Sequence, residues 1–333
     1  MSPLARLYTP LLKNKLHKLP AALSSFSTTT PNYNTTDQQT NRPLPPPIQV
    51  SVTESAGRGV LATRSIGAGD LIHTAKPLIT HPSVSQLSDV CYFCLKRLHS
   101  GGGSIQVNAR YQTIHFCSED CIQQSKGFYE VEKQADWSAY DEHCRVLGLK
   151  YPHLVKRLAC MVISGAAPAE SLDILQPAGL IPEMILEMEN EFGLLKSTLT
   201  KAGFKDAQME FLTKQWYIGV LARIRINAFR IELVGGSYED LLLSAAASVA
   251  AESAVGNAVY ILPSFYNHDC DPNSHIIWIE NVNARLKALR DIEAGEELRI
   301  CYIDASMDHG ARQNLLFEGF GFHCKCPRCL SGD

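Results

Sequence analysis

The segment Pro263–Asn273 reads PSFYNHDCDPN and follows a short apolar run that is typical of a β-strand. Within it, Asn267, His268 and Cys270 place two polar side chains and a metal-binding thiol almost next to one another. The later sequence FHCKCPRC adds three more cysteines, Cys324, Cys326 and Cys329. A tetrahedral zinc site needs four ligands, and Cys270 can supply the missing one. We therefore expect the cysteine-rich tail to fold back onto this segment and the active site to lie at that contact.

Composition places the chain among ordinary globular proteins. It has 333 residues, of which 45% are hydrophobic and 20% are charged, with a formal net charge of −3. This length allows one large domain or two smaller ones with a sizeable core. The near-neutral charge argues against a protein that coats nucleic acid. Residues 241–262 are apolar but include Glu252 and Asn257, which argues against a membrane span.

The cysteine count is high, at 11. No secretory signal with a long apolar core is visible, so reduced zinc ligands are favoured over disulfides, and a disulfide framework is the alternative. A second group has zinc-finger spacing, Cys-x2-Cys and then Cys-x3-Cys, formed by Cys91, Cys94, Cys117 and Cys121. Few apolar residues lie between these pairs, so metal binding should supply much of the local folding energy.

Residues 1–47 do not have the composition of a folded segment. They are basic and rich in Ser and Thr, contain no acidic residue before Asp37, and end in a proline run. This is typical of a mitochondrial or plastid transit peptide. The alternative is a disordered tail that is not cleaved.

Periodicity predicts strands at both ends of the remaining chain and helices between them. Alternating runs begin at Ile48, and a further strand is expected over Asn227–Val234. Residues 145–226 have helical spacing, Ser118 has the character of a helix start, and Asp308–Phe317 should form a last short helix.

Several motifs occur in a fixed order along the chain. They are Gly57-Arg58-Gly59, the two cysteine pairs, Asn227-Ala-Phe229, Asn267-His268-x-Cys270, Gly295-Glu296-Glu297-Leu298 with Tyr302, and the cysteine tail after Phe322. Together they resemble SET-domain protein lysine methyltransferases of the SMYD-like type, in which a MYND-type zinc finger interrupts the SET domain. Membership of a plant-type trithorax-related class stays open.

The resemblance implies an α+β SET-domain fold with short-strand sheets, a pseudo-knotted C-terminal segment, zinc-finger and helical insertions, and a post-SET zinc tail. The SET domain would consist of residues 48–86 and 227–306. The finger would occupy 87–145, the helical insertion 146–226 and the post-SET segment 307–333.

The resemblance also implies S-adenosylmethionine as methyl donor and a protein lysine as acceptor. The expected cofactor-binding residues are Gly57, Arg58, Gly59, Asn227, Asn267, His268, Tyr302 and Phe322. The lysine channel falls on Phe229, Phe320 and Tyr302, with Tyr302 as the catalytic residue. One zinc site takes Cys91, Cys94, Cys117 and Cys121, and the other takes Cys270, Cys324, Cys326 and Cys329.

The chain departs from the family pattern in its finger and its channel. The middle Cys-x2-Cys pair of a two-zinc finger is absent, and Tyr140 replaces the histidine that would precede Cys144. We therefore expect one zinc in the finger and a structural role for Cys144. Phe320 stands where close relatives often have tyrosine, which could change the number of methyl groups added.

Each candidate residue also has a structural interpretation. Tyr302 could be a strand-end core residue, and His268 could be a core histidine bonded to backbone. Asn267 offers both a donor and an acceptor that could contact an adenine edge. Glu296 and Glu297 are interpreted as a turn and an edge-strand surface rather than as an acid–base pair.

The function predicted from these motifs is protein-lysine N-methylation, on a histone tail or another protein. The alternative is a non-catalytic SET and zinc-finger adaptor. We expect a monomer with no direct nucleic-acid or membrane binding. The family resemblance points to a chromatin regulator in the nucleus, whereas the N-terminal composition points to a mitochondrion or plastid.

Overall fold

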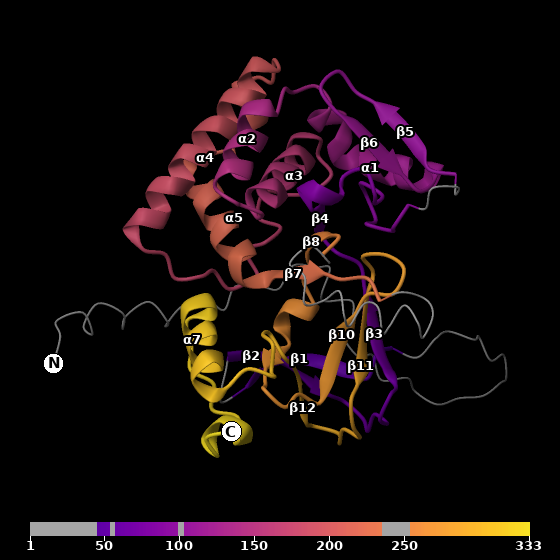
Figure 1. The fold of residues 1–333 in the computed structure, drawn as a ribbon, viewed down its shortest axis with the longest axis vertical. Coiled ribbons are helices and arrows are strands. Elements are labelled where there is room, and N and C mark those ends of the chain that lie inside the picture. Colours follow the sequence, from indigo (N-terminus) through magenta and orange to yellow (C-terminus); the bar gives the residue numbers. More distant parts are fainter. Residues whose placement is uncertain (1–44, 54–56, 99–102, 235–253) are drawn as a thin grey trace, which may run out of the picture. The chain divides into compact units, whose positions relative to one another are not determined.

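The computed structural model describes residues 45–53, 57–98, 103–234 and 254–333, and residues Pro46–Asp333 form one compact unit (Figure 1). The predicted transit-like segment 1–47 lies outside the described residues except for its last three, as does most of the apolar stretch 241–262. Among the described helices, none is long and apolar enough to cross a membrane.

The first sheet joins both ends of this unit. Strands β1 (Ile48–Thr53) and β2 (Gly57–Ala62) pair antiparallel where the sequence predicts strands from Ile48 onward, and β12 (Glu297–Ile300) pairs antiparallel with β2. The short strand β9 (Asn267–His268) then pairs parallel with β12, with Asn267 opposite Arg299. The strand order is β1-β2-β12-β9. This parallel pairing brings the Asn-His segment to the last strand of the chain.

Two further three-stranded sheets complete this part of the fold. One has the order β10-β11-β3, from β10 (Ser274–Ile277), β11 (Ala284–Ala288) and β3 (Leu71–Ala75). The other has the order β4-β8-β7, from β4 (Ile79–Pro82), β8 (Gly256–Val259) and β7 (Ala228–Ile231). The predicted strand Asn227–Val234 is therefore shorter than expected, because Asn227 ends helix α5 and the strand stops at Ile231.

In the segment expected to form the finger, the first cysteine pair is followed by the hairpin of β5 (Ile105–Asn108) and β6 (Thr113–Phe116) and then by α1 (Glu119–Glu132). Ser118 caps α1, as predicted, by accepting a hydrogen bond from the Cys121 amide. The predicted helical stretch 145–226 contains α3 (Pro152–Ile163), α4 (Pro182–Lys201) and α5 (Lys214–Asn227), whereas α2 (Ser138–Val146) starts before it. Short 3-10 turns cover Val84–Gln86, Asp206–Met209 and Pro263–Phe265.

The C-terminal segment forms α7 (His309–Phe320) and α8 (Pro327–Leu330). Gly321 ends α7 in the left-handed conformation, with φ of 80°, which turns the chain towards the cysteine tail. Leu316 of α7 packs with Cys270 and the tail cysteines in a small core separate from the main one. In Figure 1, α7 lies at the same end of the unit as β1, β2 and β12, and α1 to α5 lie at the other end. The domain boundaries expected from the sequence stay a prediction.

A buried ion pair joins the finger to the helices and to the second three-stranded sheet. Arg157 of α3 is 1% exposed and pairs with Glu132 of α1 at 3.2 Å. The Arg157 guanidinium also donates to the Thr80 carbonyl of β4 at 2.6 Å and lies 4.3 Å from the Tyr92 ring centroid. The Tyr92 hydroxyl donates to Glu132 at 3.0 Å. One charged pair therefore fixes three chain segments against one another.

Two buried histidines lie nearby. The rings of His81 on β4 and His153 on α3 stack with centroids 4.7 Å apart. Burial, followed by the charges of Arg157 and Lys156, lowers the pKa of both histidines, that of His153 to about 3. Both rings are therefore neutral in the folded protein near pH 7.

We expect Glu132→Ala to lower the free energy of unfolding by about 3–5 kcal/mol, because it leaves the Arg157 charge buried without its partner. Urea unfolding followed by circular dichroism measures this loss. The control is Glu130→Ala on the same helix, where Glu130 forms an exposed pair with Lys133. The free energy of unfolding of Glu130→Ala should stay within about 0.5 kcal/mol of that of wild type. Equal losses in the two variants would contradict the role of the buried pair.

Stability should also fall on mild acidification. The unfolded histidines bind protons below about pH 6.5 while the folded rings do not, so stability rises with pH across this range. Between about pH 6.5 and pH 5, each of the two histidines should remove about 2 kcal/mol. Urea midpoints measured across this range test the slope. In His153→Gln, the slope of the unfolding free energy against pH should correspond to about one bound proton fewer. An unchanged slope would contradict a neutral, buried His153.

Candidate active site

A cavity of about 590 Å³ lies where the first sheet meets α5, β7 and the C-terminal segment. Its volume is within the usual range of small-molecule sites. Residues that the sequence analysis singled out make up much of its wall, namely Gly57, Arg58, Asn227, Phe229, Asn267, Tyr302, Phe320 and Phe322. The structure thus brings together residues from both ends of the described chain. Two predicted cofactor residues, Gly59 and His268, are not among the described residues that line it.

Tyr302 is held in the wall by its hydroxyl and by its ring. Its hydroxyl donates to the Tyr266 carbonyl at 2.6 Å, and its ring centroid lies 5.0 Å from that of Phe320. Burial, and then the charge of Glu297, raises the pKa of Tyr302 above its usual value. The hydroxyl therefore stays protonated at neutral pH and, with its proton directed to Tyr266, offers lone pairs to the cavity.

Tyr266 is a functional neighbour that the sequence reasoning missed. Its carbonyl accepts the Tyr302 hydroxyl, and its own hydroxyl lies 3.0 Å from Nε2 of His73 on β3. It also lines the cavity. A tyrosine next to Asn267 carries no local signal of this contact, because the partner lies on a strand almost 200 residues away.

The side chain of Asn267 lies between two strands of the first sheet. Its Nδ2 donates to the Arg58 carbonyl of β2 at 3.1 Å and to Oε1 of Glu297 at 2.7 Å. Both amide protons are thereby used, so Oδ1 is the remaining hydrogen-bonding atom. Asn267 can therefore offer a ligand only an acceptor, and its contact with the cofactor stays a prediction.

Glu297 corrects one of our expectations. We interpreted it as part of an edge-strand surface, but β12 lies between β2 and β9 and is an inner strand. The Glu297 side chain is 12% exposed and also accepts from the Arg299 guanidinium at 2.6 Å. Glu296 does lie in the predicted turn, where it pairs with exposed Arg290. The error arises because strand order, unlike strand identity, depends on contacts that are distant in sequence.

Asn227 is held in the same way as Asn267. As the last residue of α5, it donates through Nδ2 to the Arg223 carbonyl at 2.7 Å and to the Gln176 carbonyl at 2.9 Å. Its Oδ1 is again the atom left for a ligand. Phe229 follows on β7 and packs edge-on against Tyr260 and Trp278.

The His268 side chain connects Tyr302 to the tail cysteines. Its Nδ1 accepts the Tyr302 backbone N–H at 3.1 Å, and its Nε2 lies 3.2 Å from Sγ of Cys270. Burial lowers the pKa of His268 to about 4, so the ring is neutral and carries its proton on Nε2. Both ring nitrogens are therefore engaged, and cofactor binding by His268 stays a prediction.

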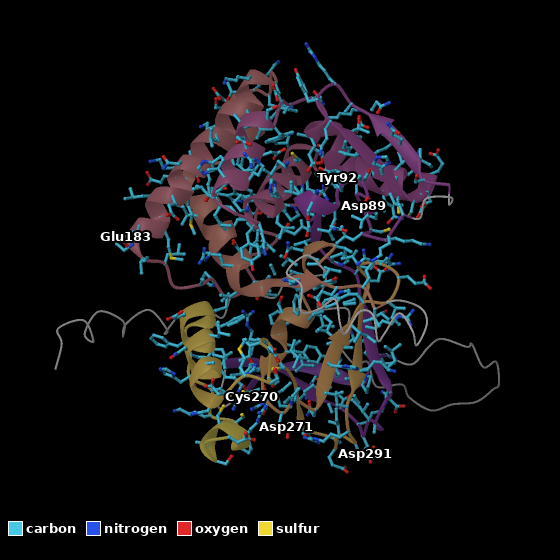
Figure 2. The ribbon with its side chains drawn as sticks, in the orientation of Figure 1. Asp89, Tyr92, Glu183, Cys270, Asp271 and Asp291 are labelled. Atoms are coloured by element: carbon cyan, nitrogen blue, oxygen red, sulfur yellow. The ribbon has the colours of Figure 1, made fainter. Side chains whose placement is uncertain are left out.

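The two predicted cysteine groups come together in space. The Sγ atoms of Cys270, Cys324, Cys326 and Cys329 all lie within 4.8 Å of one another, and so do those of Cys91, Cys94, Cys117 and Cys121. Cys270 Sγ is 3.5 Å from Cys329 Sγ and 4.0 Å from Cys324 Sγ. A tetrahedron with Zn–S bonds of about 2.3 Å has edges of about 3.8 Å, so each group fits a zinc ion. Figure 2 shows Cys270 beside the C-terminal helices and Tyr92, from the finger, in the other half of the unit.

Cys144 belongs to neither group and is buried in the main core. Tyr140, which replaces a zinc-binding histidine in the resemblance, donates its hydroxyl to the Pro152 carbonyl and lies 3.0 Å from the Tyr217 hydroxyl. Tyr217 in turn donates to Glu191 at 2.8 Å. A buried hydrogen-bond chain therefore occupies this position within the described residues.

Comparisons with known proteins identify the family of this chain. The model of the SET domain family matches residues 57–303. Histone-lysine N-methyltransferase ATXR4 of Arabidopsis thaliana is 62% identical over 290 residues, which cover 87% of this chain and 88% of that protein.

More distant similarity extends to other kingdoms. Histone-lysine N-methyltransferase SMYD3 of Homo sapiens is 25% identical, over 86% of this chain and 62% of that protein. The solved SET domain of LSMT bound to lysine and AdoHcy aligns with a TM-score of 0.38 at 13% identity, over 84% of this chain and 53% of that one. The family match and the 62% identity decide the assignment: this chain belongs to the SET-domain family.

Proposed function

We propose that this protein transfers a methyl group from S-adenosylmethionine to the side-chain amine of a protein lysine. The observation that carries the proposal is the cavity that joins Asn267, Tyr302 and a set of aromatic rings in a chain of the SET-domain family. The relative with 62% identity is named a histone-lysine methyltransferase, which makes histone lysines the first substrates to test.

When bound, S-adenosylmethionine supplies an electrophilic methyl group on a sulfonium sulfur, and transfer to the lysine nitrogen leaves S-adenosylhomocysteine. The chain's own part is alignment of the two reactants and exclusion of water. The acceptor must lose a proton first, which costs about 4–5 kcal/mol at pH 7 for a lysine with the reference pKa near 10.4.

Phe229, Phe320 and Tyr302 lower that cost. Their rings form an apolar wall, and burial against it disfavours the charged ammonium. Cation–π attraction by the same rings, about 0.5–2 kcal/mol, helps the lysine to enter and offsets part of this effect. The Tyr302 hydroxyl donates to Tyr266, so it can only accept from the incoming amine. It therefore orients the amine by accepting one N–H, and the proton of the ammonium leaves to solvent.

We infer that each cysteine group holds one zinc ion, which would give two per chain. In the tail, Cys270, Cys324, Cys326 and Cys329 would hold the ion and tie the segment that carries Phe320 and Phe322 to the Asn267 segment. The ion's role there is structural, because four thiolates leave no open position for a substrate.

Calorimetric titration with S-adenosylhomocysteine and a radiolabelled methyl-transfer assay on histone and non-histone peptide arrays test the function. Wild type should bind the ligand and label lysine peptides, and Asn267→Ala should bind weakly. Tyr302→Phe should lower the transfer rate by about 100-fold, because the amine loses its orienting contact.

The control is Tyr111→Phe, which removes a hydroxyl from an exposed tyrosine of the finger and should leave the rate unchanged. The chain would be a non-catalytic adaptor if wild type bound no ligand and labelled no peptide.

Cys326→Ala should remove one of the two zinc ions and abolish methyl transfer, while most of the main core stays folded. Zinc content by mass spectrometry, circular dichroism and transfer rate measure the three effects. Cys160→Ala is the matched control, since Cys160 is a buried thiol outside both cysteine groups. Methyl transfer retained by Cys326→Ala would refute the role given to the tail.

A further inference from the structure

Glu297 acts on the cavity without lining it. Glu297 is not among the described residues of the cavity wall, whereas Asn267 is. Oε1 of Glu297 accepts a hydrogen bond from Nδ2 of Asn267 at 2.7 Å. Its other oxygen, Oε2, accepts from Arg299 at 2.6 Å and 3.0 Å. The carboxylate is therefore held between a cavity residue and a cation of its own strand.

This contact decides which way the Asn267 amide faces. A carboxylate only accepts hydrogen bonds, so the amide must present nitrogen to Glu297. The Arg58 carbonyl, which also only accepts, lies 3.1 Å from the same nitrogen. If the amide turned over, its oxygen would face two acceptors and lose both hydrogen bonds. The two contacts together therefore keep Oδ1 as the atom that a ligand can meet.

Gly59 provides a second, independent observation. A Cβ at this position would lie 2.6 Å from Oε1 of Glu297, 2.7 Å from Cγ2 of Thr53 and 3.0 Å from Nδ2 of Asn267. No side chain fits there unless these three groups move. The absence of a side chain at Gly59 on β2 leaves the space in which Asn267 of β9 and Glu297 of β12 form their hydrogen bond.

The charge of Glu297 is only partly balanced. Arg299 binds its carboxylate and also lies 3.5 Å from Oδ2 of Asp269, so one guanidinium faces two carboxylates. Burial raises the pKa of Tyr302, and the charge of Glu297 raises it further. The direct contact of Glu297 with the cavity wall is the hydrogen bond that it accepts from Asn267.

We propose that Glu297 is a positioning residue that fixes Asn267 with its oxygen available to the methyl donor, so that the bound ligand must present a hydrogen-bond donor, N–H or O–H, at this point. The inference rests on the proposed function, in that the cavity binds the methyl donor. It assigns a role to a residue on the strand next to the glycine motif and outside the cavity wall.

A double-variant cycle tests this polarity with S-adenosylhomocysteine as the probe in calorimetric titration. In Glu297→Gln, Arg299 takes the new side-chain oxygen and the new N–H faces Asn267, whose amide turns over. The dissociation constant should rise about tenfold. Asn267→Asp alone sets two carboxylates against each other and should weaken binding further.

The double variant Asn267→Asp/Glu297→Gln restores a donor–acceptor pair and leaves an oxygen for the ligand. It should bind at least about fivefold more tightly than Asn267→Asp. In methyl transfer, Glu297→Gln should raise KM for S-adenosylmethionine and leave KM for the lysine peptide and kcat within about twofold. A purely structural role of Glu297 would not raise KM for S-adenosylmethionine while leaving KM for the peptide and kcat nearly unchanged. Glu293→Gln, an exposed residue of the preceding turn, is the control and should match wild type.

Two outcomes would overturn the inference alone: normal binding by Glu297→Gln, or additive losses across the cycle while wild type binds the probe. Failure of wild type to bind the probe would instead overturn the proposed function, and the inference with it.

If Asn267→Asp does not fold, as judged by thermal melting, the Gly59→Ala variant tests the role of Glu297 instead. It keeps both side chains but pushes them apart, so it should reproduce the KM increase of Glu297→Gln, and an unchanged KM would refute the role.

Discussion

The parallel pairing of β9 with β12 is the contact on which the site depends. It involves only two residues of each strand, with Asn267 opposite Arg299 and His268 opposite Ile300. From this register follow the hydrogen bond that Asn267 donates to Glu297, the hydrogen bond that the Tyr302 amide donates to His268, and the approach of Cys270 to the tail cysteines. A two-residue pairing is weak alone, so we infer that the cysteine group and its small core stabilise it.

Three polar residues of the cavity wall share one arrangement. The donors of Asn227, Asn267 and Tyr302 are all used by backbone carbonyls or by Glu297. Each therefore presents an oxygen acceptor as its remaining group. These acceptors can receive hydrogen bonds from a ligand. The same wall contains Arg58, Arg225 and Arg230, so it offers charged donors beside the neutral acceptors.

The finger is attached to the rest of the fold by buried polar contacts rather than by metal alone. Arg157 and Glu132 bind the segment around Tyr92, and the chain from Tyr140 through Tyr217 to Glu191 fills the place of a ligand that the family resemblance would lead one to expect. Such pairs stabilise only while complete, since a single missing partner leaves a buried charge or hydroxyl unsatisfied. The finger, with its single group of four cysteines, is thus also held by buried hydrogen bonds to the neighbouring helices.

Sequence alone determined the features that depend on local spacing: the two cysteine groups, the Asn-His segment, the helix start at Ser118 and the strand identity of the two ends. Ligand spacing and capping are local, so they can be seen within a few residues. Only the tertiary structure decided that β12 is an inner strand, that Glu297 and Tyr266 support the site, and that the His268 ring turns towards Cys270. These depend on which strands become neighbours, and that is set by contacts between residues far apart in the chain.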